Sequence, residues 1–187
     1  AAPKRSHFLV ALALFVLALL SKTVTCSLPA AILLLVYWKR GRITVRDVVP
    51  LLPFFVVGAG LAYFTAHREA THVRAVGPEF DLSPAQRALI AGRALWFYAW
   101  KLVYPMHLSF IYERWTVDPR SFIQWLYPIA FLVVVAVLFG YRAKITRGPL
   151  VAVLFFAGTL VPALGFVNVY PMRYSFVADH FQYLASI

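Results

Sequence analysis

Acidic residues are scarce in this chain. Only 7 of its 187 residues are Asp or Glu, against 18 Lys or Arg, which leaves a formal net charge of +11 at pH 7. Six of the seven carboxylates follow residue 68, and they are dispersed from Glu69 to Asp179. General acid–base catalysis by paired carboxylates needs two acids held at a short, fixed distance. The spacing here does not single out such a pair.

Cysteine and metal-binding patterns are scarce as well. Cys26 is the only cysteine, which excludes an internal disulfide, and its apolar neighbours predict a small buried side chain. The five histidines are scattered, and no two have the close helical spacing of a zinc motif with acids nearby. We therefore predict no metal site. The chain also lacks a nucleophile elbow, a glycine loop for phosphate and a metalloprotease helix.

Apolar residues are abundant instead. They make up 62% of the chain, and charged residues make up 13%, whereas soluble domains are about 45–50% apolar and about 25% charged. One soluble core of this size cannot hide that much apolar surface, so lipid is the predicted solvent. The basic residues form short clusters between apolar runs, notably at 39–46 and 142–147. This pattern fits the positive-inside rule, and it predicts membrane lipids and no nucleic acid as partners.

The apolar runs predict an all-α, polytopic transmembrane bundle in a single domain, 1–187, with about five crossings. The predicted spans are approximately 8–20, 24–38, 48–66, 120–141 and 149–167, with an interfacial helix at about 84–104 and an outer-side terminal helix at about 171–187. A spanning helix needs roughly 20 residues. The block 8–38 is therefore either a hairpin of two short helices that turns near Lys22, or one long broken helix. The hairpin is favoured because it puts Lys4 and Arg5 on the same side as the 39–46 cluster.

This topology places the basic clusters inside, and the Lys22 turn, residues 67–118 and residues 168–187 outside. The helix at 84–104 mixes basic residues with tryptophan and tyrosine, which is typical of the membrane–water boundary. The chain begins without Met and stops inside a helix-like pattern. We therefore expect it to be a fragment of a longer protein.

The candidate site residues lie on the predicted outer side. In a terminal helix Arg173 and His180 would share one face, which suits an anionic group such as a phosphate. The alternatives are that Arg173 only snorkels to the interface and that His180 only caps a neighbouring helix. Lys101 and Lys22 are further candidates for a headgroup phosphate. For both, a charge at the membrane boundary with no ligand is the competing interpretation.

Four stretches of the sequence resemble the membrane half of a known family. They are Leu-Leu-Ser-Lys-Thr-Val-Thr at 19–25 with Leu-Pro-Ala-Ala at 28–31, Trp-Phe-Tyr-Ala-Trp-Lys-Leu-Val-Tyr-Pro at 96–105, Ser-Phe-Ile-Tyr-Glu-Arg-Trp at 109–115, and Tyr-Pro-Met-Arg-Tyr-Ser-Phe-Val-Ala-Asp-His-Phe-Gln-Tyr-Leu at 170–184. Together they resemble bacterial polytopic proteins with C-terminal tetratricopeptide repeats. Those proteins are similar to the transmembrane-and-tetratricopeptide-repeat protein O-mannosyltransferases, which are GT-C glycosyltransferases.

The resemblance implies a GT-C-like membrane half of an enzyme in the bacterial inner membrane. It implies sugar transfer from a polyprenyl-phosphate donor to a protein hydroxyl, without a metal or other cofactor. The family's catalytic acid lies in an outer loop that precedes the residues matched here, so no catalytic residue is expected in this chain. The family has an arginine where this sequence has His180, and Arg173 is a candidate to replace its phosphate contact.

Two other functions compete with this one. The chain can be a non-catalytic membrane anchor for a repeat scaffold that binds protein partners. It can also be a transporter or lipid flippase, which would favour charges near the span centres and an inverted repeat. The sequence shows neither of these features.

Overall fold

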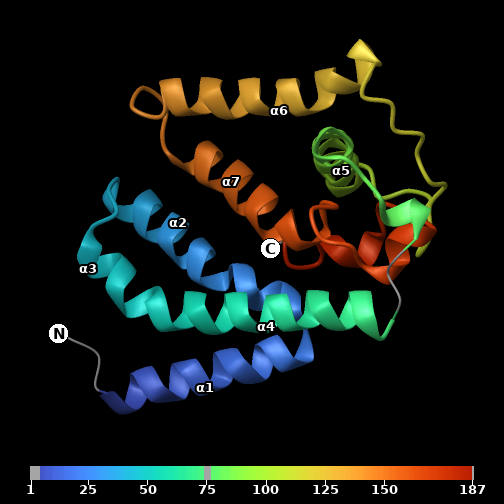
Figure 1. Ribbon diagram of the computed structural model, residues 1–187. Helices are drawn as coiled ribbons and strands as arrows, with labels where there is room; N and C mark the ends of the chain where they lie inside the picture. The colour runs from blue at the N-terminus through green and yellow to red at the C-terminus, as the bar shows by residue number, and fades with distance from the viewer. Residues whose placement is uncertain (1–4, 74–76, 187) are drawn as a thin grey trace.

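The computed structural model describes residues 5–73 and 77–186; Lys4 and Ile187, which were part of the predictions, lie outside the described residues. All regular elements within those ranges are helical (Figure 1). The α-helices are α1 Arg5–Ser21, α2 Leu28–Arg40, α3 Val45–Val48, α4 Leu52–Thr71, α5 Pro84–Val103, α6 Phe122–Tyr141 and α7 Gly148–Leu160. Shorter 3-10 turns are η1 Thr23–Ser27, η2 Val49–Leu51, η3 Pro78–Phe80, η4 Val161–Ala163, η5 Tyr170–Arg173 and η6 Asp179–Gln182.

The block 8–38 forms two helices. Lys22 has an extended backbone, with φ −151° and ψ 111°, and it separates α1 from the turn η1. Within the turn, the Thr25 hydroxyl donates to the carbonyl of Lys22 at 2.8 Å, and the Ser27 hydroxyl donates to that of Val24 at 3.0 Å. Such local bonds compete with a continuous helix. Of the two alternatives, the structure therefore has the pair of helices turning at Lys22 (Figure 1).

Among the described residues, two helices are long and apolar enough to cross a membrane. They are the run Val45–Thr71, which joins α3, η2 and α4 over 27 residues, and α6 with 20 residues. A 20-residue helix is about 30 Å long, which matches the hydrocarbon core of a bilayer. The apolar helices Arg5–Ser21 and Gly148–Ala163 are shorter, and α2 has 13 residues. The five crossings therefore remain a prediction, although the all-helical architecture is confirmed.

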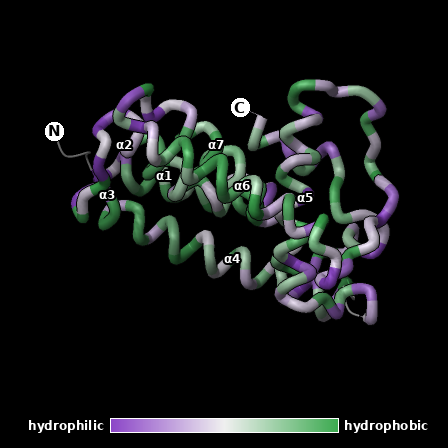
Figure 2. The backbone as a smooth tube through the Cα atoms, turned by 90° about the horizontal axis from the view of Figure 1, so that it is seen from above, coloured by the Kyte–Doolittle hydropathy of each residue, from purple (hydrophilic) through white to green (hydrophobic). Residues whose placement is uncertain are grey.

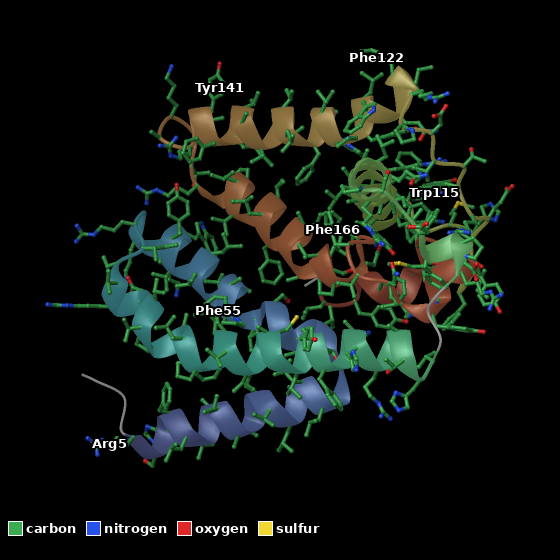
Figure 3. All side chains as sticks on the ribbon, in the orientation of Figure 1. Arg5, Phe55, Trp115, Phe122, Tyr141 and Phe166 are labelled. Carbon is green, nitrogen blue, oxygen red and sulfur yellow. The ribbon has the colours of Figure 1, made fainter. Side chains whose placement is uncertain are left out.

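The polar loops of the described residues lie at two opposite ends of the molecule. At one end lie Arg5, Tyr141 and the turn between α2 and α3, and at the other lie Phe122 and Trp115 (Figures 1 and 3). We call the first the basic end, because it contains the clusters at 39–46 and 142–147. The second is the loop end, which contains residues 72–73, 77–83, 104–121 and 164–186. Hydrophobic segments join the two (Figure 2).

Helix α5 runs across the direction of α4 and α6, and Figure 1 shows it nearly end-on. A capping box begins the helix: the Ser83 hydroxyl accepts from the Gln86 backbone N–H, and the Gln86 side chain accepts from the Ser83 N–H. It crosses α6 at Gly92, where a Cβ would come within 2.6 Å of the Pro128 ring. A helix thus exists where the interfacial helix at 84–104 was predicted, and it lies beneath the loop end of α6; its place at a membrane interface stays a prediction.

The buried hydrophobic residues form separate cores in different parts of the molecule. One is formed by α1 and α4 around Phe15, Leu19 and Phe54. The larger one surrounds Tyr98 of α5, which is fully buried. The Tyr98 hydroxyl donates to the Ala178 carbonyl at 3.3 Å and accepts from the Ala178 N–H at 3.1 Å. This pair of bonds fixes the terminal segment against α5.

Residues 171–186 do not form the single helix that we predicted. They form two 3-10 turns, η5 and η6, and Ala178 between them is extended, with φ −154° and ψ 139°. Burial of Met172, Phe176 and Val177 holds the segment against α5 and the loops, and this tertiary packing overrides helical periodicity. Arg173 and His180 therefore do not share a helix face.

Candidate functional site

Lys22 and His180 meet at the loop end, although 158 residues separate them. The Lys22 ammonium lies 3.5 Å from the His180 carbonyl oxygen and 5.5 Å from the centre of the Tyr183 ring. The extended backbone at Lys22 ends α1 and releases this side chain from the helix. The lysine is exposed, so its charge is accessible. This contact brings together two of the four candidate residues.

The His180 imidazole is held between aromatic rings. It stacks on Phe110 with the ring centres 4.3 Å apart, and Phe181 meets it edge-on at 4.4 Å. Its Nδ1 atom is buried without a hydrogen-bond partner among the described residues. Burial, and then the positive charge of Lys22, lower the pKa of His180 below its ordinary value. The lowered pKa favours the neutral imidazole, which has one N–H and one acceptor nitrogen.

Asp179 anchors the same turn to the loop 104–121. Its Oδ2 accepts from the Ser109 backbone N–H at 2.5 Å and from the Tyr112 hydroxyl at 2.7 Å. Its Oδ1 is buried and has no partner among the described residues. The carboxylate thus fixes the orientation of η6, and with it the position of the His180 ring.

Lys101 lies beneath this loop and is bound by the protein itself. It is 8% exposed, and its ammonium donates to the carbonyls of Met106 at 2.6 Å and His107 at 3.2 Å. The ring of Tyr112 lies 5.1 Å from the same ammonium. His107 has a positive φ of 51°, which is uncommon for a residue other than glycine. Lys101 therefore supports a strained loop, and it does not present its charge to a ligand.

Arg173 lies apart from these residues. Its Nε forms an ion pair with Glu79 Oε1 at 3.0 Å. Glu79 lines an open groove of about 290 Å³, together with Asp81, Arg114 and Phe176. Because a carboxylate already neutralises Arg173, the structure gives no support to its replacing the family's arginine beside His180.

Sequence reasoning missed the partners that organise the site. Phe110, Tyr112, Tyr183 and Asp179 were not singled out as site residues. Phe110 and Tyr112 fall inside the stretch 109–115 that carries the family resemblance, and Tyr183 falls inside 170–184. The resemblance was thus the available signal. Spacing along one helix could not find them, because the segment is not a helix.

The arrangement can hold an anionic group. An exposed ammonium and a neutral imidazole supply one positive charge and one ring N–H, which suit phosphate oxygens. Among residues 5–73 and 77–186, no three His, Cys, Asp or Glu side chains gather as metal ligands would. No protein-family model, curated protein or solved structure matches the chain.

Proposed function

We propose that this chain is the donor-binding membrane part of a glycosyltransferase. The enzyme transfers a sugar from a polyprenyl-phosphate donor to a protein hydroxyl on the outer face. It is a multi-pass protein of the bacterial inner membrane, and the loop end faces outward. The catalytic acid belongs to an outer loop that precedes the residues of this chain, as the family resemblance implies.

One observation carries the proposal: the four stretches that resemble the family converge at the loop end. Lys22, from the first stretch, contacts His180, from the last. Tyr112, from the third, contacts both Lys101, from the second, and Asp179. Residues that are far apart in sequence and share one resemblance are expected to build one site. Their meeting supports a common function for them.

Lys22 and His180 are the residues that we assign to the donor phosphate. The Lys22 ammonium provides the charge, and the neutral His180 ring donates one N–H to a phosphate oxygen. Asp179 and Lys101 position them: Asp179 orients η6, and Lys101 holds the loop that carries Phe110. Arg173 is left out of the donor site because of its ion pair with Glu79.

The membrane arrangement is consistent with this role. The helices Val45–Thr71 and α6 are long enough to cross, and α5 lies across them at the loop end (Figure 1). A helix in the plane of the interface, next to a cationic site, suits a substrate whose phosphate lies at the headgroups and whose chain lies in the hydrocarbon. The basic clusters then face the cytoplasm.

The test is sugar transfer from polyprenyl-phosphate sugars by the full-length parent protein in membranes. A Lys22→Gln, His180→Gln double variant is expected to lose at least tenfold in kcat/KM, because two charge-assisted phosphate contacts are removed. The matched control is Arg173→Gln, which removes one charge at the loop end and is expected to retain activity. Full activity in the double variant, or an equal loss in the control, would contradict the site assignment.

A second candidate function is a non-catalytic anchor for a tetratricopeptide-repeat scaffold. One observation favours it: Lys101 and Arg173, two of the four candidate residues, are already bound by the protein's own carbonyls and carboxylate. In that case the full-length parent transfers no sugar from any donor tested. Retention of repeat-bound protein partners by the intact parent would then identify the anchor.

A further inference from the structure

The two basic loops meet at the basic end of the molecule. The Arg147 guanidinium lies directly over Gly41, where a Cβ would come within 2.3 Å of its central carbon. Next to it, the indole nitrogen of Trp38 would lie 3.6 Å from a Cβ on Gly148. A glycine in each loop thus allows the end of α2 and the start of α7 to come close together. Cations that are about 100 residues apart in sequence form one surface.

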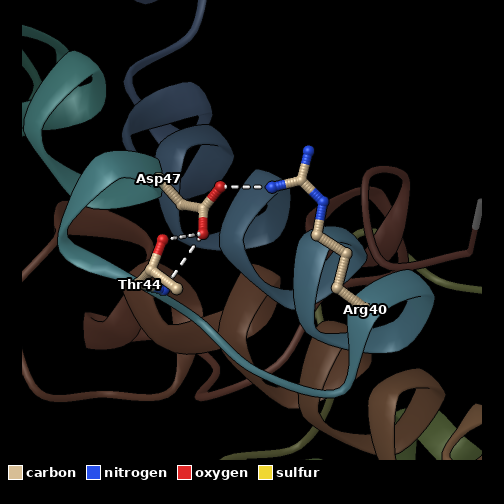
Figure 4. A network of polar contacts seen from close by, with 3 residues as sticks. All are labelled: Arg40, Thr44 and Asp47. Carbon is tan, nitrogen blue, oxygen red and sulfur yellow. Dashed lines mark hydrogen bonds and ion pairs between the residues drawn. The ribbon is translucent and has the colours of Figure 1, made fainter.

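This surface is strongly positive. Its only carboxylate, Asp47, pairs with Arg40 at 2.6 Å and also accepts from the backbone N–H and the hydroxyl of Thr44 (Figure 4). The remaining cations have no carboxylate partner among the described residues. They are Lys39, Arg42, Arg46, Arg142, Lys144 and Arg147. Six cations in and beside the two basic loops are therefore not compensated by a carboxylate of the described residues.

Apolar side chains are exposed between these cations. Ile43 is 44% exposed, Val45 75% and Ile145 70%. Trp38, at the end of α2, is 48% exposed. Alternating cationic and apolar side chains, with a tryptophan beside them, are typical of a segment that lies among lipid headgroups. A surface for a soluble anion such as free phosphate has no need of these apolar groups.

We propose that the basic end holds the headgroup of an anionic phospholipid between its two loops. Lys144 and Arg147 of one loop and Arg42 of the other contact the phosphate, because all three are exposed and unpaired. Arg40 contributes less, since Asp47 neutralises it. The site is distinct from the proposed donor site, which lies at the loop end, and it does not depend on sugar transfer.

Quenching of tryptophan fluorescence by brominated lipids tests this proposal. The full chain is reconstituted in phosphatidylcholine vesicles that contain increasing fractions of brominated phosphatidylglycerol. The signal of Trp38 is obtained by difference from a Trp38→Phe variant. Each cation near an anionic surface is worth about 1 kcal/mol, or roughly fivefold in affinity. The double variant Lys144→Gln, Arg147→Gln is therefore expected to weaken the anionic lipid's binding well over tenfold.

Two further variants make the outcome decisive. Arg68→Gln, Arg120→Gln removes the same charge from exposed positions elsewhere and is expected to leave quenching at Trp38 unchanged. Asp47→Asn frees Arg40 while keeping a side-chain oxygen that can accept from the Thr44 N–H in the capping box of α3, and it is expected to strengthen binding about fivefold. A gain of affinity cannot arise from misfolding. Equal quenching by brominated phosphatidylglycerol and brominated phosphatidylcholine, equal losses in both double variants, or no gain from Asp47→Asn overturns the proposal.

Discussion

The cations at the two ends of the molecule are held in opposite ways. At the loop end, protein atoms surround two of them: Arg87 binds the Gly165 carbonyl and the Asn168 side chain, both at 2.8 Å, and Lys101 binds two carbonyls. At the basic end, Arg42 and Lys144 are exposed and make no ion pair with the described residues. Lysine and arginine thus stabilise the loops by internal hydrogen bonds at one end, and they form an exposed charged surface at the other.

The comparison shows which charged side chains are available to bind a ligand. A buried cation that is fully hydrogen-bonded stabilises the fold and has little capacity left for a ligand. An exposed cation with no partner costs little and is available to an anion. At the loop end, Lys22 differs from Arg87 and Lys101, because its ammonium is exposed and its contacts with the described residues are a carbonyl and a ring. This is why the proposed donor site rests on Lys22 and not on Lys101.

The largest effect on stability is expected from removing a hydrogen-bonded cation at the loop end. Arg87→Met deletes a guanidinium that also donates to the Leu82 and Phe80 carbonyls, each at 3.3 Å. Hydrogen bonds from charged groups contribute about 1.5–3 kcal/mol each, and their acceptors are left unsatisfied. We expect a loss of about 3 kcal/mol or more in unfolding free energy, measured by chemical unfolding in detergent. Arg42→Gln, at the basic end, is the control and is expected to change it by under about 0.5 kcal/mol.

Equal losses in these two variants would remove the distinction between the ends. Limited proteolysis of residues 164–186 adds a local measurement. If Arg87 braces this segment, cleavage there accelerates in Arg87→Met before the rest of the chain unfolds.

A smaller effect is expected at the contact between the basic loops. Gly41 has a positive φ of 73° and ends α2. Alanine there adopts a left-handed conformation at a cost of about 1 kcal/mol, and its Cβ displaces the flexible Arg147 side chain. Thermal unfolding should show this loss. Gly140→Ala is the matched control, because nothing lies within 4 Å of its Cβ and alanine favours the helix. A loss in the control, or none at Gly41, would contradict this account.

Helix boundaries with clear local signals could be predicted from the sequence. The helix predicted at about 84–104 begins where α5 begins, at Pro84 after the Ser83 cap, and its predicted end differs from Val103 by one residue. The predicted span 120–141 is α6, Phe122–Tyr141. The helix that contains the predicted span 48–66 continues to Thr71 through polar residues. Polar residues mark where an apolar run ends, but the helix itself can continue beyond that run into water.

The site could be predicted only in part. Lys22 and His180 were singled out, but no periodicity links residues 158 positions apart. The supposed shared face of Arg173 and His180 assumed a helix, which the burial of Phe176 and Val177 and the bonds to Tyr98 prevent. Lys101 looked like a boundary charge, because sequence does not show that two carbonyls turn back over it. Tertiary contacts of this kind decide which cations remain free.

The smallest effect is a pH dependence that sharpens the assignment of Lys22. Burial and then Lys22 lower the pKa of His180 in the folded chain below its unfolded value of about 6.5. Its contribution to stability is therefore complete above pH 6.5, and it decreases as the pH falls from 6.5 through the folded pKa, because the unfolded chain binds the proton more readily. Lys22→Gln removes a repulsive charge, so the pKa of His180 is expected to rise toward 6.5.

Titration of the His180 ring by NMR, in the full chain and in Lys22→Gln, measures this shift directly. Lys144→Gln is the control: it removes the same charge at the basic end and should leave the pKa of His180 unchanged. Opposite results, with His180 titrating at or above 6.5 or responding equally to both variants, would mean that Lys22 does not act on His180. If the pKa of His180 shifts in Lys22→Gln alone, the two side chains interact electrostatically. They then lie close enough together to bind a single phosphate between them.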